Sequence, residues 1–252
     1  MTQVAKVRRA LKYYRQLNAA LPGTETVLVE QPDHLRAAKL LHAQTYVRLG
    51  IVTETDLTAD GCIGPDEDPA QNHAQYFIVQ GLKDGAPHVF AAVRIIYADP
   101  GKGLASFPAY ATQQFYPDQR KLLESLDVAD VGEISALVRE PGVSAMTTLM
   151  LYRAIWHYAL AQGYVRLLVS CDARLHQRCK MIFGEAWMRA GPDGSMRGVQ
   201  VVPVLVNIPA SLDEAHKLSR TNPVKRFVKR RALKFFLDGL PAAKTLTESR
   251  EE

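Results

Sequence analysis

Cysteine is scarce in this chain of 252 residues, and the three cysteines follow no pattern of a metal site or a disulfide framework. Cys62, Cys171 and Cys179 are widely separated and form no CxxC pair. Zinc ribbons and small disulfide-rich domains need closely spaced cysteines, so this spacing argues against both and predicts no metal site. Free cysteines of this kind are typical of a reducing cytoplasm.

Long apolar runs are also missing. No segment approaches the ~18 uncharged apolar residues that span a bilayer. The start of the chain, MTQVAKVRRALKYYRQL, carries too many charges for the core of a signal peptide. Hydrophobic residues nevertheless make up 47% of the chain, enough for a substantial core. We expect a globular cytoplasmic protein, with peripheral attachment to the inner membrane face as the alternative.

Acidic residues are absent from two basic segments near the ends of the chain. Residues 1–15 hold five Lys or Arg and residues 220–234 hold seven, with no Asp or Glu in either. The chain has 31 Lys and Arg, so 31 − 12 = 19 of them lie outside these two segments, against 26 Asp and Glu. The rest of the chain therefore has a net charge near −7, although the whole chain is +5. This asymmetry predicts local docking of acyl carrier protein, another acidic partner or an anionic membrane. The alternative is two solvated helix faces.

Hydrophobic periodicity and turn residues predict a mixed α/β fold. The pattern places a central sheet of about seven strands, flanked by helices, in a single domain over residues 1–220, followed by a basic helix and polar tail over 221–252. Helices are predicted at 3–19, 32–50, 111–126 with an interruption at Pro117, 145–162 and 173–183. Strands are predicted at 24–30, 74–80, 88–98, 127–140, 164–170, 186–190 and 199–207.

The strand within residues 127–140 carries a carboxylate beside a hydroxyl. Residues two apart on a strand face the same way, so Glu133 and Ser135 should share a face with Val131 and Leu137. A glutamate on a half-apolar strand has two interpretations. Either the strand lies at an edge and Glu133 is in water, or the strand lines a site that needs a base.

The order of the predicted elements resembles that of the GNAT acyltransferase fold. LYRAIWHYALAQGYVRLLVS, residues 151–170, is similar to the long helix and following strand of many GNAT proteins. KMIFGEAWMRAG is similar to the segment that precedes their last hairpin.

A narrower resemblance is to the acyl-homoserine lactone synthases and the long-chain N-acyl amino acid synthases. FAAVRIIY supplies Arg94, GEISALVRE supplies Glu133 and Ser135, and DEDPAQNHAQYF resembles their Asp-rich loop. The resemblance covers residues 24–208. It implies transfer of a fatty acyl group from acyl carrier protein or acyl-CoA to the amine of an amino acid or related small molecule. No cofactor would be bound permanently, since the acyl-phosphopantetheine donor is a co-substrate.

The chemistry of amide formation suggests a role for each of these residues. Glu133 in a partly apolar cleft would have a raised pKa and accept the ammonium proton. Ser135 would hydrogen-bond the substrate or shape the strand. Arg94 would pair with Glu133 or clamp a carboxylate of the acceptor.

Three departures from the resemblance affect its details. Ala136 stands where an Arg is expected, and VSAMTT at 143–148 lacks the glycines that close on a pyrophosphate, which fits a donor with a single phosphate. Lys180 stands where many GNAT enzymes carry a Tyr that protonates the leaving thiolate, so that acid is unassigned. The donor is expected near the start of the long helix, at Leu137, Arg139, Ser144, Thr147 and Thr148.

The sequence leaves two other functions as alternatives to the acyltransferase. A non-catalytic GNAT-like module that binds an acyl or phosphate ligand, or a membrane, fits the departures. Arg94, Glu133 and Ser135 favour the enzyme. Cys171 and His176 are not predicted as a nucleophilic pair, because no third group orients the histidine. Tyr152, Trp156 and Tyr158 are predicted to be core residues, so no nucleic-acid partner is expected.

Overall fold

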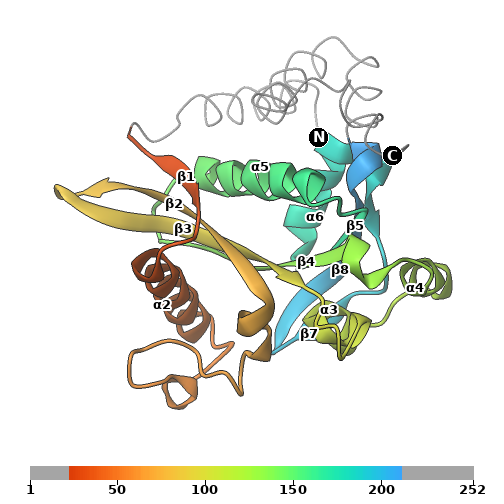
Figure 1. Cartoon of the computed structure of the whole chain (residues 1–252), viewed down its shortest axis with the longest axis horizontal. Coiled ribbons are helices and arrows are strands. Elements are labelled where there is room, and N and C mark those ends of the chain that lie inside the picture. The colour runs from red at the N-terminus through yellow and green to blue at the C-terminus, as the bar shows by residue number, and fades with distance from the viewer. Residues whose placement is uncertain (1–22, 212–252) are drawn as a thin grey trace, which may run out of the picture.

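A computed structural model of the chain describes residues 23–211, which fold around one mixed sheet (Figure 1). The strand order is β1-β2-β3-β4-β5-β8-β6, with β7 paired to β8. The β4–β5 pair is parallel and the other pairs are antiparallel. The predicted mixed sheet is therefore confirmed. The strands are β1 (Glu25–Leu28), β2 (Ala74–Lys83), β3 (Ala86–Tyr97), β4 (Val131–Arg139), β5 (Arg166–Cys171), β6 (Trp187–Arg189), β7 (Gly194–Met196) and β8 (Val199–Asn207).

Helices cover both faces of this sheet. Figure 1 shows α5 along one face and α2 along the other. One large apolar cluster lies between the sheet and helices α5 and α6, and two smaller clusters lie on the opposite face beneath α2, α3 and α4. No helix between residues 23 and 211 is both long and apolar enough to cross a membrane. The helices are α2 (Pro32–Arg48), α3 (Pro108–Thr112), α4 (Pro117–Glu124), α5 (Ala145–Ala161) and α6 (Ala173–Phe183).

Local sequence signals set most of the helix ends. Ser144 precedes α5, and its Oγ accepts a hydrogen bond of 3.2 Å from the Met146 N–H, as expected of an N-cap. Pro117 occupies the first position of α4, where a missing N–H costs nothing, and residues 113–116 separate α4 from α3. The predicted helix over 111–126 is therefore two short helices.

The hairpin of β2 and β3 has a shorter turn than the sequence suggested. Residues 81–87 were expected as a loop, but only Asp84 and Gly85 lie outside the strands. Both have positive φ, 55° and 82°, which is the backbone of a two-residue hairpin turn. The three-residue strand β7 was not predicted, because three residues are too few to show an alternating pattern.

A bulge in β4 reverses part of the predicted face assignment. Ala136 has φ 51°, in the left-handed region. Arg94 pairs with Ser135 while Ala92 pairs with Val138, so Ala136 and Leu137 both lie opposite one residue of β3. Beyond the bulge the alternation is shifted, and Leu137 packs against the cluster beneath α5. The prediction that Leu137 shares the face of Glu133 is wrong for this reason.

Some predictions lie outside the described residues. The helix at 3–19, the two basic segments at 1–15 and 220–234, and the domain boundary near residue 220 all fall in residues 1–22 or 212–252. They remain predictions.

Candidate functional site

A buried ion pair lies on the face of the sheet that carries α2. Arg94 on β3 is 3% exposed, and its two terminal nitrogens donate to the carboxylate of Asp68 at 2.6 and 2.8 Å. Burial by itself would raise the pKa of Asp68, but the hydrogen bonds and charge of Arg94 hold it below its usual value. The pair is a bidentate fork, so both groups stay charged at neutral pH.

Tyr76 and Ser135 add further partners for the two terminal nitrogens of this guanidinium. Arg94 Nη1 donates to the Tyr76 hydroxyl at 3.2 Å, and Nη2 lies 3.4 Å from Ser135 Oγ. Arg94 thus has a different carboxylate partner from the predicted Glu133, because Asp68 enters from the loop before β2. Ser135 directly opposes Arg94 in the β3–β4 ladder, so the two residues are cross-strand neighbours.

Glu133 lies two residue pairs further along the same ladder, opposite Ile96. Its side chain is 1% exposed, so the interpretation of a glutamate in water is wrong. Its Oε2 accepts a hydrogen bond of 2.8 Å from the Ala109 N–H in the first turn of α3. Burial raises the pKa of Glu133 to about 8, although the Ala109 N–H and the charge of Arg94 oppose the shift. A carboxyl with this pKa exchanges a proton near neutral pH, as a general base must.

The strands β4 and β5 separate just beyond Glu133. Their parallel ladder runs from Val131 and Arg166 to Ile134 and Val169, and β5 continues only along β8. The rest of β4, residues 135–139, is paired on its β3 side alone. Backbone groups freed in this way, together with the bulge at Ala136, provide hydrogen-bonding groups next to Glu133 along β4.

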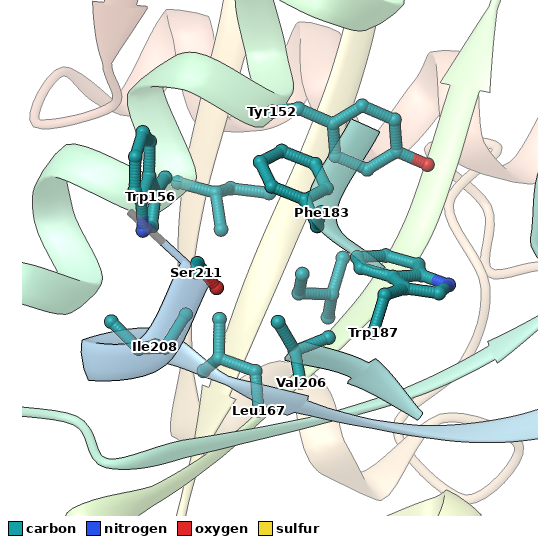
Figure 2. A pocket seen from close by; sticks show the side chains of 10 residues that line it. Tyr152, Trp156, Leu167, Phe183, Trp187, Val206, Ile208 and Ser211 are labelled. Atoms are coloured by element: carbon teal, nitrogen blue, oxygen red, sulfur yellow. The ribbon is translucent and has the colours of Figure 1, made fainter. Parts of the chain in front are cut away.

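An apolar pocket lies on the other face of the sheet, over the paired part of β4, β5 and β8. Figure 2 shows aromatic side chains from α5, α6 and β6 meeting aliphatic side chains from β5 and β8 around it. The cavity has a volume of about 30 Å³. The expectation that Tyr152 and Trp156 belong to the core is confirmed. The lining residues are Ile134, Tyr152, Ile155, Trp156, Leu167, Phe183, Trp187, Val206, Ile208 and Ser211.

The predicted donor residues lie around the start of α5. Leu137 packs beside the apolar cluster that contains this pocket. Arg139 is exposed and donates to the carbonyl oxygen of Val143, just before the helix. Ser144 Oγ is occupied as the N-cap, while Thr147 is buried and its hydroxyl donates to the Ser144 carbonyl at 2.8 Å. Thr148 is partly exposed. Their role in holding a phosphate remains a prediction.

Two other residues keep the character that the sequence suggested. Lys180 on α6 is largely exposed, with Nζ 3.6 Å from Glu185, so it offers no tyrosine-like acid. Cys171 is buried, and burial raises the pKa of its thiol to about 12. A thiol that stays protonated at neutral pH is a packing group, not a nucleophile.

Sequence reasoning missed three residues of this site. Asp68 was visible only as one of several acids in an Asp-rich loop, and nothing marked it as the partner of Arg94. Tyr76 reads as an ordinary strand aromatic. His42 reads as one polar residue of an amphipathic helix, but it is 3% exposed, and its ring lies 4.1 Å from that of Tyr46.

Comparison with known proteins supports the fold but gives no sequence relative. No protein-family model matches the sequence, and no curated protein matches it. Solved structures do match. FeeM, an N-acyl amino acid synthase from uncultured soil microbes, is 12% identical with a TM-score of 0.55 over 81% of this chain and 99% of its own. The acyl-homoserine lactone synthase LasI is 16% identical with a TM-score of 0.53 over 74% and 91%.

A third structure, TofI in a ternary complex with an inhibitor and MTA, is 19% identical with a TM-score of 0.51 over 75% of this chain and 95% of its own. These identities are too low to transfer a substrate. The agreement extends over nearly the whole length of each neighbour, as the resemblance in the element order and in the β3 and β4 motifs implied. The chain therefore has the GNAT-like acyltransferase fold, in the form that it takes in these synthases.

Proposed function

We propose that this protein is an N-acyltransferase that moves a long fatty acyl group from acyl carrier protein or acyl-CoA to the amine of an amino acid or related small molecule. The observation that carries the proposal is Glu133, a fully buried carboxyl with a pKa raised to about 8 where β4 leaves β5. On one side of it lies the Arg94–Asp68 pair, and on the other face of the sheet lies an apolar pocket.

The reaction assigns a task to each side of the sheet. Glu133 accepts a proton from the acceptor's ammonium group, directly or through water, and so produces a neutral amine. The amine nitrogen attacks the thioester carbonyl, and backbone N–H groups near the β4 bulge stabilise the oxyanion. The C–S bond then breaks, the nitrogen loses its second proton as the amide forms, and the thiolate takes up that proton directly or through water. The Arg94–Asp68 ion pair fixes the part of the site that faces the acceptor. Because the two charges cancel, the pair adds no net charge there.

The donor is expected to carry a long chain on a phosphopantetheine arm. The apolar pocket with its aromatic walls is suited to hydrocarbon, and at about 30 Å³ it must widen to admit a long chain. The segment VSAMTT lacks the glycines that let backbone amides close on a pyrophosphate, which favours a singly phosphorylated arm on a carrier protein.

The test is a donor and acceptor panel with the purified full-length chain. Acetyl-CoA, a long-chain acyl-CoA and the same acyl group on carrier protein are each incubated with the twenty protein amino acids. Mass spectrometry should detect an N-acyl amino acid with the long-chain donors at a far higher rate than with acetyl-CoA. Preferential use of acetyl-CoA would show that the protein is an ordinary acetyltransferase and would overturn the donor assignment.

A second candidate is a non-catalytic module of the same fold that binds an acyl or phosphate ligand. The hydrogen bond from Ala109 to Glu133 favours it, because a buried carboxyl at the start of α3 also serves as an anchor for that helix. Binding of the long-chain donor without any acylated product in the panel would support this candidate.

A further inference from the structure

His42 is a buried polar residue for which the proposed chemistry has so far given no task. It lies on α2, one turn after Ala38 and one turn before Tyr46, on the stripe of the helix that faces β2, β3 and β4. Its side chain is 3% exposed. Among residues 23–211, no hydrogen-bond partner reaches its Nε2. A buried nitrogen without a partner is costly, commonly by about 1–3 kcal/mol, so its retention points to a ligand.

The imidazole lies within the electrostatic reach of the Arg94–Asp68 pair. Burial lowers the pKa of His42 to about 3, and the positive charges of Arg94 and Arg197 contribute while Asp68 opposes them. The ring is therefore neutral at physiological pH. A neutral imidazole donates through one nitrogen and accepts through the other.

Unused hydrogen-bond donors around His42 favour an acceptor group such as a carboxylate. The charges nearby are paired, because Arg94 binds Asp68 and Arg197 Nη1 lies 3.6 Å from a Glu67 carboxylate oxygen. Arg94 adds a second unsatisfied donor, because its buried Nε has no hydrogen-bond partner in the described part of the chain. Its two terminal nitrogens are already taken by Asp68. The α2 face thus offers two unused hydrogen-bonding nitrogens, His42 Nε2 and Arg94 Nε, to a ligand.

We propose that His42 determines acceptor specificity by donating a hydrogen bond from Nε2 to the carboxylate of the amine acceptor. This inference rests on the proposed N-acyltransferase function. The acceptor's ammonium group is then directed toward Glu133, further along the same face of the sheet. His42 would recognise an amino acid, and not a simple amine, as the acceptor class.

The experiment measures steady-state kinetics of the full-length chain with two acceptors. One is the amino acid that the wild type acylates fastest among the twenty, and the other is its primary amide, which has no carboxylate. His42→Phe should raise the KM for the amino acid by about tenfold or more, as expected from loss of a hydrogen bond to a charged group. It should leave the KM for the amide and for the acyl donor unchanged. His42→Gln, which keeps a polar group near the Nε2 position, should recover much of the loss.

His34→Phe is the matched control, because His34 lies on the same helix, is partly exposed and has no place in the site. Its KM values should equal those of the wild type. Thermal unfolding of each variant shows whether it is folded, and His42→Phe should be at least as stable as the wild type. Equal KM values for the amino acid in wild type and folded His42→Phe would overturn the inference. A wild type that acylates no acceptor would instead overturn the proposed function.

Discussion

Glu133 combines complete burial with a single side-chain hydrogen bond from within residues 23–211, and this makes its protonation state sensitive to pH. A base acts only when deprotonated, so kcat/KM for the acceptor should rise with pH and level off above about 8, the pKa to which burial raises this carboxyl. Glu133→Gln keeps the shape and still accepts from the Ala109 N–H. We expect turnover to fall by ~100-fold or more and the rise near pH 8 to disappear.

The pH–rate profiles of wild type and Glu133→Gln decide this point, with the same donor at saturation. The acceptor's own amine titrates in both profiles, so only the difference between them reports Glu133. Wild-type rates for the Gln variant at neutral pH would remove Glu133 from the mechanism and leave it as an anchor of α3.

The same pKa shift has a consequence for stability. The pKa of Glu133 is about 8 in the folded chain, against 4.5 for an ordinary glutamate in water. Below about pH 4.5 both states hold the proton. Between these two values Glu133 has lost its proton in the unfolded chain and keeps it in the folded chain. The free energy of unfolding therefore falls by about 1.4 kcal/mol for each unit by which the pH rises. Glu133→Gln does not titrate and should become more stable relative to wild type between pH 5 and pH 8.

Urea unfolding of both chains at pH 5, 6, 7 and 8 measures this difference. All other groups titrate alike in the two chains and cancel. Stability curves that stay parallel across this range would show that Glu133 has an ordinary pKa in the folded protein.

At the scale of single elements, the bulge in β4 decides which side chains reach which face. Ala136 adopts φ 51°, which costs a residue with a Cβ roughly 1–2 kcal/mol. A β-branched side chain fits this conformation worse. Ala136→Val should lower the free energy of unfolding by about 1–3 kcal/mol and reduce acyl transfer, because the bulge fixes Leu137 and the freed backbone groups.

Ala136→Gly is the matched variant, since glycine adopts this backbone freely. Relief of strain and the greater entropy of the unfolded chain oppose each other, so its stability should stay within about 1 kcal/mol of wild type. Urea unfolding and an acylation assay of both variants test the bulge. A fully stable and active Ala136→Val would show that the bulge is not needed.

The apolar pocket between α5, α6 and the sheet should set the acyl length. Ile155 on α5 and Val206 on β8 both line it and are nearly fully buried. Ile155→Val removes one methylene from the wall and Val206→Ile adds one. A methylene in a hydrophobic pocket is worth about 10–200-fold in kcat/KM, so the preferred chain should lengthen in the first variant and shorten in the second.

Competition among acyl donors of graded length, read by mass spectrometry, measures the shift. Ile78→Val is the control, because Ile78 is fully buried in the cluster beneath α2, on the other face of the sheet. It should lose about 0.5–1.5 kcal/mol of stability and keep the wild-type length preference. Identical length profiles in all three variants would place the acyl chain elsewhere.

At the scale of the whole molecule, charge is distributed very unevenly along the chain. The segments 1–15 and 220–234 carry twelve basic residues, while the remainder is near −7. Exposed charge pairs are individually worth only ~0.2–1 kcal/mol, so several must act together. The test variant changes four residues of the second segment to Gln: Lys225, Arg226, Lys229 and Arg230. We expect it to raise the KM for a carrier-bound donor or to weaken vesicle binding. Its turnover of a free thioester analogue should be nearly unchanged.

The matched control removes the same number of charges from the described surface, at Arg48, Lys83, Lys102 and Lys121. Both variants are titrated with carrier-bound and free donors, and sedimented with anionic vesicles, from low to high salt. The Debye length falls from ~10 Å at 0.1 M to ~3 Å at 1 M salt, so any difference should vanish at high salt. Equal behaviour of the two fourfold variants at low salt would leave the second basic segment as a solvated surface.

Much of the fold followed from local patterns in the sequence. The order of elements, the start of α5 at Ser144, and the placement of Glu133 and Ser135 on one strand depend on residues within a few positions of each other. Hydrophobic periodicity, caps and turn residues act over that range. The proline in 111–126 also marked a real helix boundary.

Contacts between distant segments were decided by the tertiary structure alone. Asp68 and Arg94 are 26 residues apart, and the choice of this acid over its neighbours depends on how the loop before β2 packs on the sheet. Burial of Glu133 and His42 depends on α3 and α2 closing over the same face, which no local pattern records. The sequence by itself determined which groups are present and in which elements they lie. Their pairing, protonation and exposure required the whole packed chain, because desolvation and charge act across space and not along the sequence.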